Sequence, residues 1–362
     1  MLNRRTLLKT AAMAIALATA SPAFAADGQV KVVATFSILG DMVNRIGGEH
    51  VALTTLVGPD GDAHVYQPVP ADAKAVAQAD VLIVNGLGFE GWLDRLVDAS
   101  GFKGMRAVAT SGVEAIAFEE DEHHEDEEHH DDDHADHNDG DHDDHADHKD
   151  GDHDDHADRK DGDHDDHADH KDDDHDDHAG HDHHDHGAYD PHAWQSARNA
   201  VIYVDNITAA LSKADPANAS VYYRNRAAYV AEIEAMDAEI RNSVETLPEA
   251  GRTVVTPHDA FGYFAEEYGL TFLAPQGLST EAEASAADVA KLIRQIRKQN
   301  IKAVFMENIS DSRLLEQIAN ETGAGIGGSL YSDALSGPDG PAGTYLDMMR
   351  HNTTALVGAL GS

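Results

Sequence analysis

The sequence predicts an α/β protein of two lobes, joined by one long helix and interrupted by a disordered insert. Short apolar runs alternate with amphipathic stretches before and after the insert, which is typical of parallel βαβ units. A single helical pattern of about thirty residues separates the two sets and exceeds what a small domain needs. The length of 362 residues also fits two domains.

The N-terminus has the pattern of a secretory signal peptide over residues 1–25. Basic residues precede an Ala-rich apolar run, and Ala23-Phe24-Ala25 forms a small-residue cleavage site. The apolar run is too short to serve as a membrane anchor. The pair Arg4-Arg5 resembles a twin-arginine export signal, with the Sec route as the alternative. Because the signal has no lipobox cysteine, we expect a protein that is free in the periplasm and not inserted in the membrane.

The first lobe is predicted to span residues 26–118 and to end with residues 188–214 after the insert. Its expected strands are residues 31–35, 51–57, 81–85 and 107–109. Its expected helices are residues 38–46, 72–77 and 89–97, and a further helix opens at Asp190-Pro191-His192 and runs towards Leu211. The alternation of these elements predicts a parallel sheet.

The long helix and the second lobe follow. Asp215-Pro216 is expected to start a linking helix over residues 215–247, along which apolar residues recur at helical spacing: Tyr222, Tyr229, Ile233, Met236 and Ile240. Residues 248–362 then repeat the βα pattern. The expected strands are residues 253–256, 271–273 and 303–306, and the expected helices are residues 260–268, 286–299, 314–322 and 343–360.

The insert, residues 119–187, differs in composition from the rest of the chain. It holds 34 acidic residues, 4 basic residues and 20 of the 25 histidines, and an 11-residue pattern repeats from His134, His145, His156 and His167. No position of the repeat is apolar enough to bury, so the segment should be disordered. Alternating imidazole and carboxylate groups are typical of a tract that binds divalent metals weakly. A solvated acidic linker is the alternative.

Charge and cysteine content limit the choice of partner. The formal charge of −41 disfavours nucleic acid and anionic membrane surfaces, because both would repel the chain. Cations are the expected partners. The absence of cysteine excludes thiolate ligands, iron–sulfur clusters and disulfides, so a bound metal must have nitrogen and oxygen ligands.

Three histidines outside the insert fall at equivalent places in the predicted βα units. His64 follows the second strand, His192 lies at a helix start, and His258 follows the strand that opens the second lobe. Open α/β sheets bind ligands at such places. Asp333, in a loop of the second lobe, is the candidate negative ligand. Three imidazoles and one carboxylate suit Zn²⁺ better than Mn²⁺ or Mg²⁺. His50 and His351 are expected to be surface residues instead.

The segments GDAHVYQP, DPHAW, TPHDAFGYFAEEYGL and LYSDALS, together with the long helix and the His-rich insert, resemble the ZnuA-type zinc-binding proteins of ABC uptake systems, within cluster A-I of the solute-binding proteins. The resemblance runs from about Val30 to the C-terminus. It implies two (βα)₄-type lobes bridged by a rigid helix, a metal in the cleft between them, and delivery to a membrane permease with its cytoplasmic ATPase. We expect a monomer.

The resemblance also assigns roles to single residues. It implies that His64, His192 and His258 bind zinc and that Asp333 is the fourth ligand, in a family where water or a glutamate beside the first histidine can take that place. Ala63 stands at that glutamate position here. Manganese-binding relatives have a carboxylate where His258 stands. Glu307 matches a family acid at a strand end and is expected to support the site or the fold.

Other functions stay open at this stage. The chain could bind manganese or another divalent metal for uptake, or sequester zinc in the periplasm without a transporter. A mononuclear zinc hydrolase is a further alternative, but the sequence has no HExxH or GxSxG motif and no evident general base. We therefore expect a transport protein and no enzyme.

Overall fold

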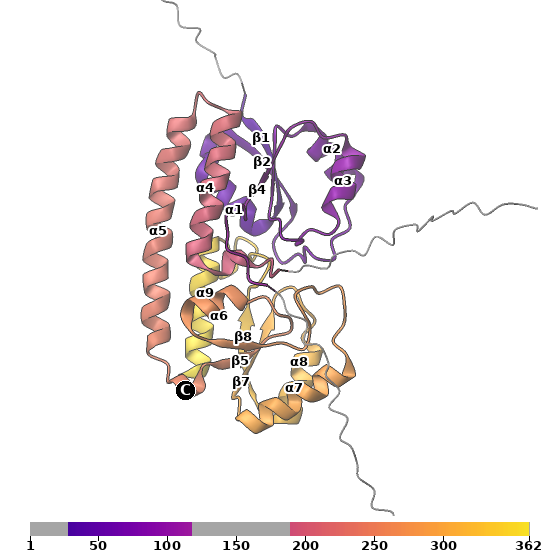
Figure 1. Cartoon of the computed structure of the whole chain (residues 1–362), viewed down its shortest axis with the longest axis vertical. Coiled ribbons are helices and arrows are strands. Elements are labelled where there is room, and N and C mark those ends of the chain that lie inside the picture. Colours follow the sequence, from indigo (N-terminus) through magenta and orange to yellow (C-terminus); the bar gives the residue numbers. More distant parts are fainter. Residues whose placement is uncertain (1–27, 118–188, 362) are drawn as a thin grey trace, which may run out of the picture. The chain divides into compact units, whose positions relative to one another are not determined.

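Two four-stranded parallel sheets organise the residues that this computed structural model describes, which are 28–117 and 189–361 (Figure 1). The predicted signal peptide and the predicted insert lie outside the described residues. All strand pairs within the two sheets are parallel. The predicted α/β class with two lobes is therefore confirmed.

The first sheet has the strand order β2-β1-β3-β4. Its strands are β1 (Val30–Phe36), β2 (Val51–Val57), β3 (Val81–Val84) and β4 (Met105–Val108). The connecting helices are α1 (Ser37–Gly47), α2 (Pro70–Gln78) and α3 (Leu93–Ser100). Helices α2 and α3 lie on one side of the sheet, and α1 lies on the other side with α4 (Ala197–Ala214) (Figure 1). Cover on both faces explains why β3 is buried along its whole length.

The second sheet repeats this topology with the order β6-β5-β7-β8. Its strands are β5 (Thr253–Val255), β6 (Thr271–Leu273), β7 (Ala303–Glu307) and β8 (Gly325–Leu330). Its helices are α6 (Gly262–Tyr268), α7 (Ala286–Gln299), α8 (Arg313–Thr322) and α9 (Tyr345–Leu360). In both sheets the first strand of the lobe is an inner strand. The loop that follows this strand therefore lies near the middle of the row of carboxyl-terminal strand ends.

The long helix α5 (Ala219–Glu245) has 27 residues and contacts elements of both lobes. It packs against α1 and α4 of the first lobe and against α6 and α9 of the second (Figure 1). Its buried side chains recur at helical spacing along its whole length: Tyr222, Tyr229, Ile233, Met236, Ile240 and Val244. The helix is therefore an integral part of the core that the two lobes share.

Two helices begin later than expected, and one strand was not expected. The helix expected from Asp215-Pro216 begins at Ala219, because the Asp215 side chain binds Asn218 and Tyr222 and forms a turn before the helix. The helix expected to open at His192 begins at Ala197, where the Ser196 side chain accepts a hydrogen bond from Asn199 N. Strand β8 was not expected, since its sequence is rich in glycine.

The chain leaves the described part of the first lobe and returns to it at neighbouring points. Ala117 and Tyr189 form an antiparallel bridge, and Asp190 N donates to Ile116 O at 2.9 Å. His192 therefore follows this junction by only a few residues.

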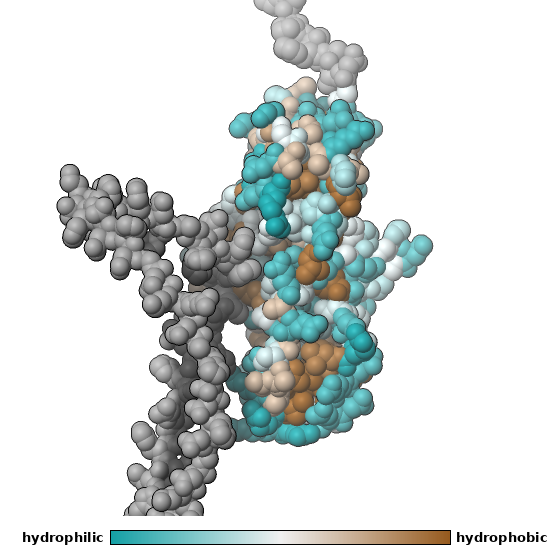
Figure 2. All heavy atoms as spheres, turned by 90° about the vertical axis from the view of Figure 1, so that its right-hand side faces the viewer, coloured by the Kyte–Doolittle hydropathy of each residue, from teal (hydrophilic) through white to brown (hydrophobic). Residues whose placement is uncertain are grey.

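Within the described ranges, none of the helices is long and apolar enough to cross a membrane. On the face in Figure 2, hydrophobic residues form small groups within a largely hydrophilic surface. Val65 and Val69, which follow His64, are two of the exposed apolar side chains. Isolated apolar side chains are common on protein surfaces, so they indicate no special role by themselves.

Candidate metal centre

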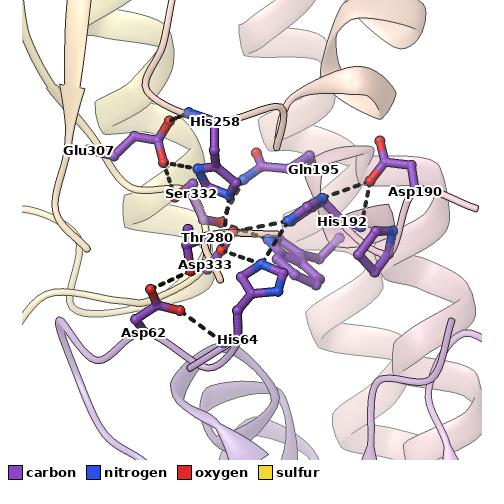
Figure 3. Close-up of polar contacts among 12 residues, drawn as sticks. Asp62, His64, Asp190, His192, Gln195, His258, Thr280, Glu307, Ser332 and Asp333 are labelled. Atoms are coloured by element: carbon purple, nitrogen blue, oxygen red, sulfur yellow. Dashed lines mark hydrogen bonds and ion pairs between the residues drawn. The ribbon is translucent and has the colours of Figure 1, made fainter. Parts of the chain in front are cut away.

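The four residues predicted as metal ligands lie on loops that follow parallel strands or precede helices. His64 lies between β2 and α2, and His258 lies between β5 and α6. His192 immediately precedes a short 3-10 helix, Ala193–Gln195, and Asp333 follows β8. The two lobes both contribute, and the four side chains point toward one another (Figure 3).

One potential ligand atom from each of His64, His192, His258 and Asp333 lies within 4.8 Å of the others. The Nε2 atoms of His64 and His258 each lie 3.2 Å from Asp333 Oδ2, and Nε2 of His192 lies 3.6 Å from Asp333 Oδ1. His64 is 5 % exposed and the other three residues are fully buried. This is a closed cluster of three nitrogen donors around one carboxylate.

Two of the imidazoles are oriented by carboxylates on their outer side. Nδ1 of His192 lies 2.7 Å from Asp190 Oδ1, and Nδ1 of His258 lies 2.5 Å from Glu307 Oε2. Ser332 Oγ also donates to Glu307 Oε2, at 2.9 Å. A carboxylate at Nδ1 favours the tautomer with the proton on that nitrogen and directs the lone pair of Nε2 to the centre. Glu307 thus lies beside a predicted ligand, which is one of the two roles that the resemblance implied for it.

The buried charges shift the pKa values of the cluster. Burial alone lowers the pKa of His258, but the carboxylates of Glu307 and Asp333 together raise this pKa well above its ordinary value. Burial raises the pKa of Asp333, but the imidazoles of His192 and His258 lower it well below its ordinary value. The two shifts together favour a protonated His258 beside an ionised Asp333.

Unpaired polar atoms at the centre indicate what the cluster can bind. Among the described residues, both oxygens of Asp333 and both ring nitrogens of His258 have no partner with hydrogen-bond geometry, although the ion-pair contacts given above are close. Buried polar atoms without such partners are costly. A divalent cation would satisfy these oxygen and nitrogen donors together, so the residues present fit a metal ion.

Aromatic side chains close the cluster on the side of the first lobe. The ring of Phe89 lies 4.8 Å from that of His64 and 4.9 Å from that of Trp194, centroid to centroid. Trp194 Nε1 and Gln195 Nε2 both donate to the carbonyl of Ser332, at 2.9 and 2.8 Å. These two bonds hold the loop of Asp333 against the first lobe.

Sequence reasoning missed Asp62 and Asp190, which precede two of the histidines by two residues. Oδ1 of Asp62 accepts from His64 N, and Oδ1 of Asp190 accepts from His192 N, both at 2.9 Å. The spacing Asp-x-His occurs in both motifs, and an Asp side chain that binds the backbone two residues on forms a known type of turn. This repeated spacing was the signal that could have identified them.

Comparison with known proteins gives a consistent result. The profile of the ZnuA family, described as zinc-uptake complex component A, periplasmic, matches residues 32–359. The manganese-binding lipoprotein MntA of Halalkalibacterium halodurans is 29 % identical over 335 residues, which cover 92 % of this chain and 90 % of that protein. The iron-binding protein YfeA of Yersinia pestis is 28 % identical over 347 residues, which cover 96 % of this chain and 91 % of that protein.

Solved structures agree on the fold. The manganese-bound periplasmic metal-binding protein of Candidatus Liberibacter asiaticus is 29 % identical, with a TM-score of 0.68 over 92 % of this chain and 100 % of that chain. The periplasmic zinc-binding protein TroA of Treponema pallidum is 24 % identical, with a TM-score of 0.71 over 92 % of this chain and 99 % of that chain. The second likeness shows a shared fold.

Proposed function

This chain belongs to the ZnuA family of periplasmic metal-binding proteins, and we propose that it captures Zn²⁺ between its two lobes for import by an ABC permease. The family consists of substrate-binding transport proteins and not of enzymes. The proposed ligands are His64, His192, His258 and Asp333. In this role Zn²⁺ is cargo, which the protein must both bind tightly and release.

The observation that carries the proposal is the convergence of these four side chains from both lobes. Their potential ligand atoms lie within 4.8 Å of one another, and all four residues are buried. Two of the histidines also have a carboxylate at Nδ1, which is the usual arrangement around a histidine that binds metal. A single buried histidine can be satisfied by one hydrogen-bond partner. Three buried histidines around the same carboxylate therefore favour a metal site.

The preference for zinc rests on the donor atoms. Three imidazole nitrogens and one carboxylate in a buried cluster suit tetrahedral Zn²⁺, whereas Mn²⁺ prefers oxygen ligands and a higher coordination number. Manganese is the second candidate, because relatives of this chain are named for binding manganese or iron. His258 is the residue that argues against it, since it supplies nitrogen where a carboxylate would suit manganese.

A metal competition experiment tests this proposal. The mature chain and a variant without residues 119–187 are each titrated with Zn²⁺ and Mn²⁺ against a chromophoric chelator. We expect about one tight Zn²⁺ per chain in both proteins, because the proposed ligands all lie outside the deleted segment, and Mn²⁺ should bind more weakly. Tight binding of Mn²⁺ over Zn²⁺ would favour the second candidate. If the shortened protein binds neither metal tightly, the proposed site is wrong.

The insert and the permease form a second part of the proposal. We propose that the histidines of residues 119–187 collect zinc at low affinity near the lobes, through an attraction that salt weakens. Delivery to a permease predicts that a strain without this gene grows poorly in the presence of a zinc chelator and recovers with added zinc. Normal growth under chelator would instead favour a protein that stores zinc without a transporter.

A further inference from the structure

The loop that carries His64 is bonded directly to the second lobe. Asp60 N donates to Leu335 O at 2.8 Å, and Asn308 Nδ2 donates to Asp60 Oδ1 at 3.1 Å. Thr280 Oγ1 donates to Asp62 Oδ2 at 2.6 Å (Figure 3). Residues on both sides of Gly61 thus hold this loop to the opposite lobe.

Asp62 uses its two carboxylate oxygens for different purposes. Oδ1 accepts from the backbone N–H of His64 at 2.9 Å and so fixes the turn that presents the imidazole. Oδ2 accepts from the hydroxyl of Thr280 in the other lobe. One side chain therefore connects the position of a proposed metal ligand to the position of the opposing lobe.

The segment of Thr280 is itself attached to the backbone around His258. Gln276 N donates to Pro257 O at 3.3 Å, and Asp259 N donates to Gly277 O at 3.2 Å. His258 and Gln276 also form a parallel bridge. Hydrogen bonds and the short stretch of chain between Gly277 and Thr280 therefore connect the His64 backbone, through Asp62, to the backbone on both sides of His258. This connection lies outside the ring of proposed ligand atoms.

His64 depends on this path more than the other two histidines do. Asp190 and Glu307 orient the rings of His192 and His258 at Nδ1. Within the described ranges, no carboxylate lies within ion-pair distance of Nδ1 of His64, and this ring is the slightly exposed one. Its position is therefore set mainly by its backbone, which Asp62 holds.

From this geometry we infer that Asp62 and Thr280 form a latch that keeps His64 in the metal site and slows the departure of the metal. The inference rests on the proposed function, and it makes Asp62 and Thr280 positioning residues that act through His64. When the latch is open, His64 is the ligand that leaves first, because the other two imidazoles stay fixed by their carboxylates. The latch thus sets the dissociation rate more than the association rate.

The test measures zinc dissociation from the full mature chain. The protein is loaded with one equivalent of Zn²⁺ and mixed rapidly with excess chelator, and the slow phase that is missing in His192→Ala is assigned to the site between the lobes. Thr280→Val removes the hydroxyl and keeps the side-chain shape, while Thr280→Ser keeps the hydroxyl. Thr322→Val is the matched control, because this half-buried threonine also donates a hydrogen bond, to Ile318 O at 2.7 Å, but lies at the end of α8.

We expect Thr280→Val to accelerate the slow phase about tenfold, as for the loss of a half-buried hydrogen bond to a charged acceptor. Thr280→Ser and Thr322→Val should keep the rate of the unmodified protein. In an Asp62→Ala background, Thr280→Val should have no further effect, because its partner is already missing. An unchanged rate in Thr280→Val, or an equal acceleration in the Asp62→Ala background, would overturn the latch. Absence of the slow phase from the unmodified protein would instead overturn the proposed function.

Discussion

Replacing His258 by alanine gives the most direct test of the metal centre. His258 is fully buried, its Nε2 lies 3.2 Å from Asp333 Oδ2, and its Nδ1 lies 2.5 Å from Glu307 Oε2. The substitution removes one of four proposed ligands and also leaves the Glu307 carboxylate without its imidazole. We therefore expect a large loss of zinc affinity and not a complete one, because three ligands remain.

The size of the loss follows from the share of one ligand. Structural zinc sites with four ligands bind with roughly 10–16 kcal/mol, so one ligand contributes about 3 kcal/mol. This corresponds to a loss of about two orders of magnitude in affinity.

The assay is competition with a chromophoric chelator of known affinity, using protein without residues 119–187 so that only the lobes bind metal. His50→Ala is the matched control. His50 is a half-buried histidine whose ring faces Tyr222 at 6.1 Å, centroid to centroid, and it is not one of the clustered residues. His258→Ala with an affinity within threefold of His50→Ala would refute the assignment of His258 as a ligand.

Three further predictions concern the fourth ligand, the protons of the site and the long helix. Asp333→Ala should cost less zinc affinity than His258→Ala, because water can replace a carboxylate ligand; a larger loss in the same competition assay would contradict this. Zinc binding should release a proton near neutral pH, because His258 with its raised pKa must become neutral to bind metal. The apparent zinc affinity should thus rise about tenfold per pH unit below that pKa and level off above it. Calorimetry in buffers of different ionisation enthalpy measures the proton release, and a result of no released proton would contradict the reasoning. Met236 is fully buried in α5, so Met236→Ala should lower the free energy of unfolding by about 2–5 kcal/mol. Glu234 is exposed on the same helix, so Glu234→Ala should change this free energy by less than about 0.5 kcal/mol. Equal denaturation midpoints of the two variants would contradict the shared core.

Strands and helices with a strong local pattern could be predicted from the sequence, and one strand could not. The strand at residues 51–57 was expected and found, because a run rich in β-branched and apolar residues lies between glycine-containing turns. Strand β8 contains three glycines and exists because it pairs with β7, as in Val304 with Ile326. A Cβ on Gly327 would lie 2.5 Å from the ring of Phe305, so packing across the sheet requires glycine there. Such a requirement arises only in the folded protein.

The candidate site also has parts that the sequence predicts and parts that depend on the folded structure. His64, His192 and His258 could be found from their positions at strand ends and helix starts, since a parallel sheet brings such positions to one edge. The contact between Asp62 and Thr280 joins residues 218 positions apart in the chain. It depends on how the two lobes dock, which no local pattern in the sequence reports. The sequence therefore indicated the proposed ligands, but it did not indicate the hydrogen bonds that we propose control the movement of His64.

Because Ala117 and Tyr189 form a bridge, the stability of the fold should depend little on the length of the segment between them. Because the two ends already lie side by side, a loop of twice the length would cost only about 0.6 kcal/mol more to close. We therefore expect a change in the number of eleven-residue repeats to have little effect on the stability of the fold that holds His192. The same junction offers a place to graft a fluorescent reporter, which would then lie only a few residues before His192, one of the proposed ligands.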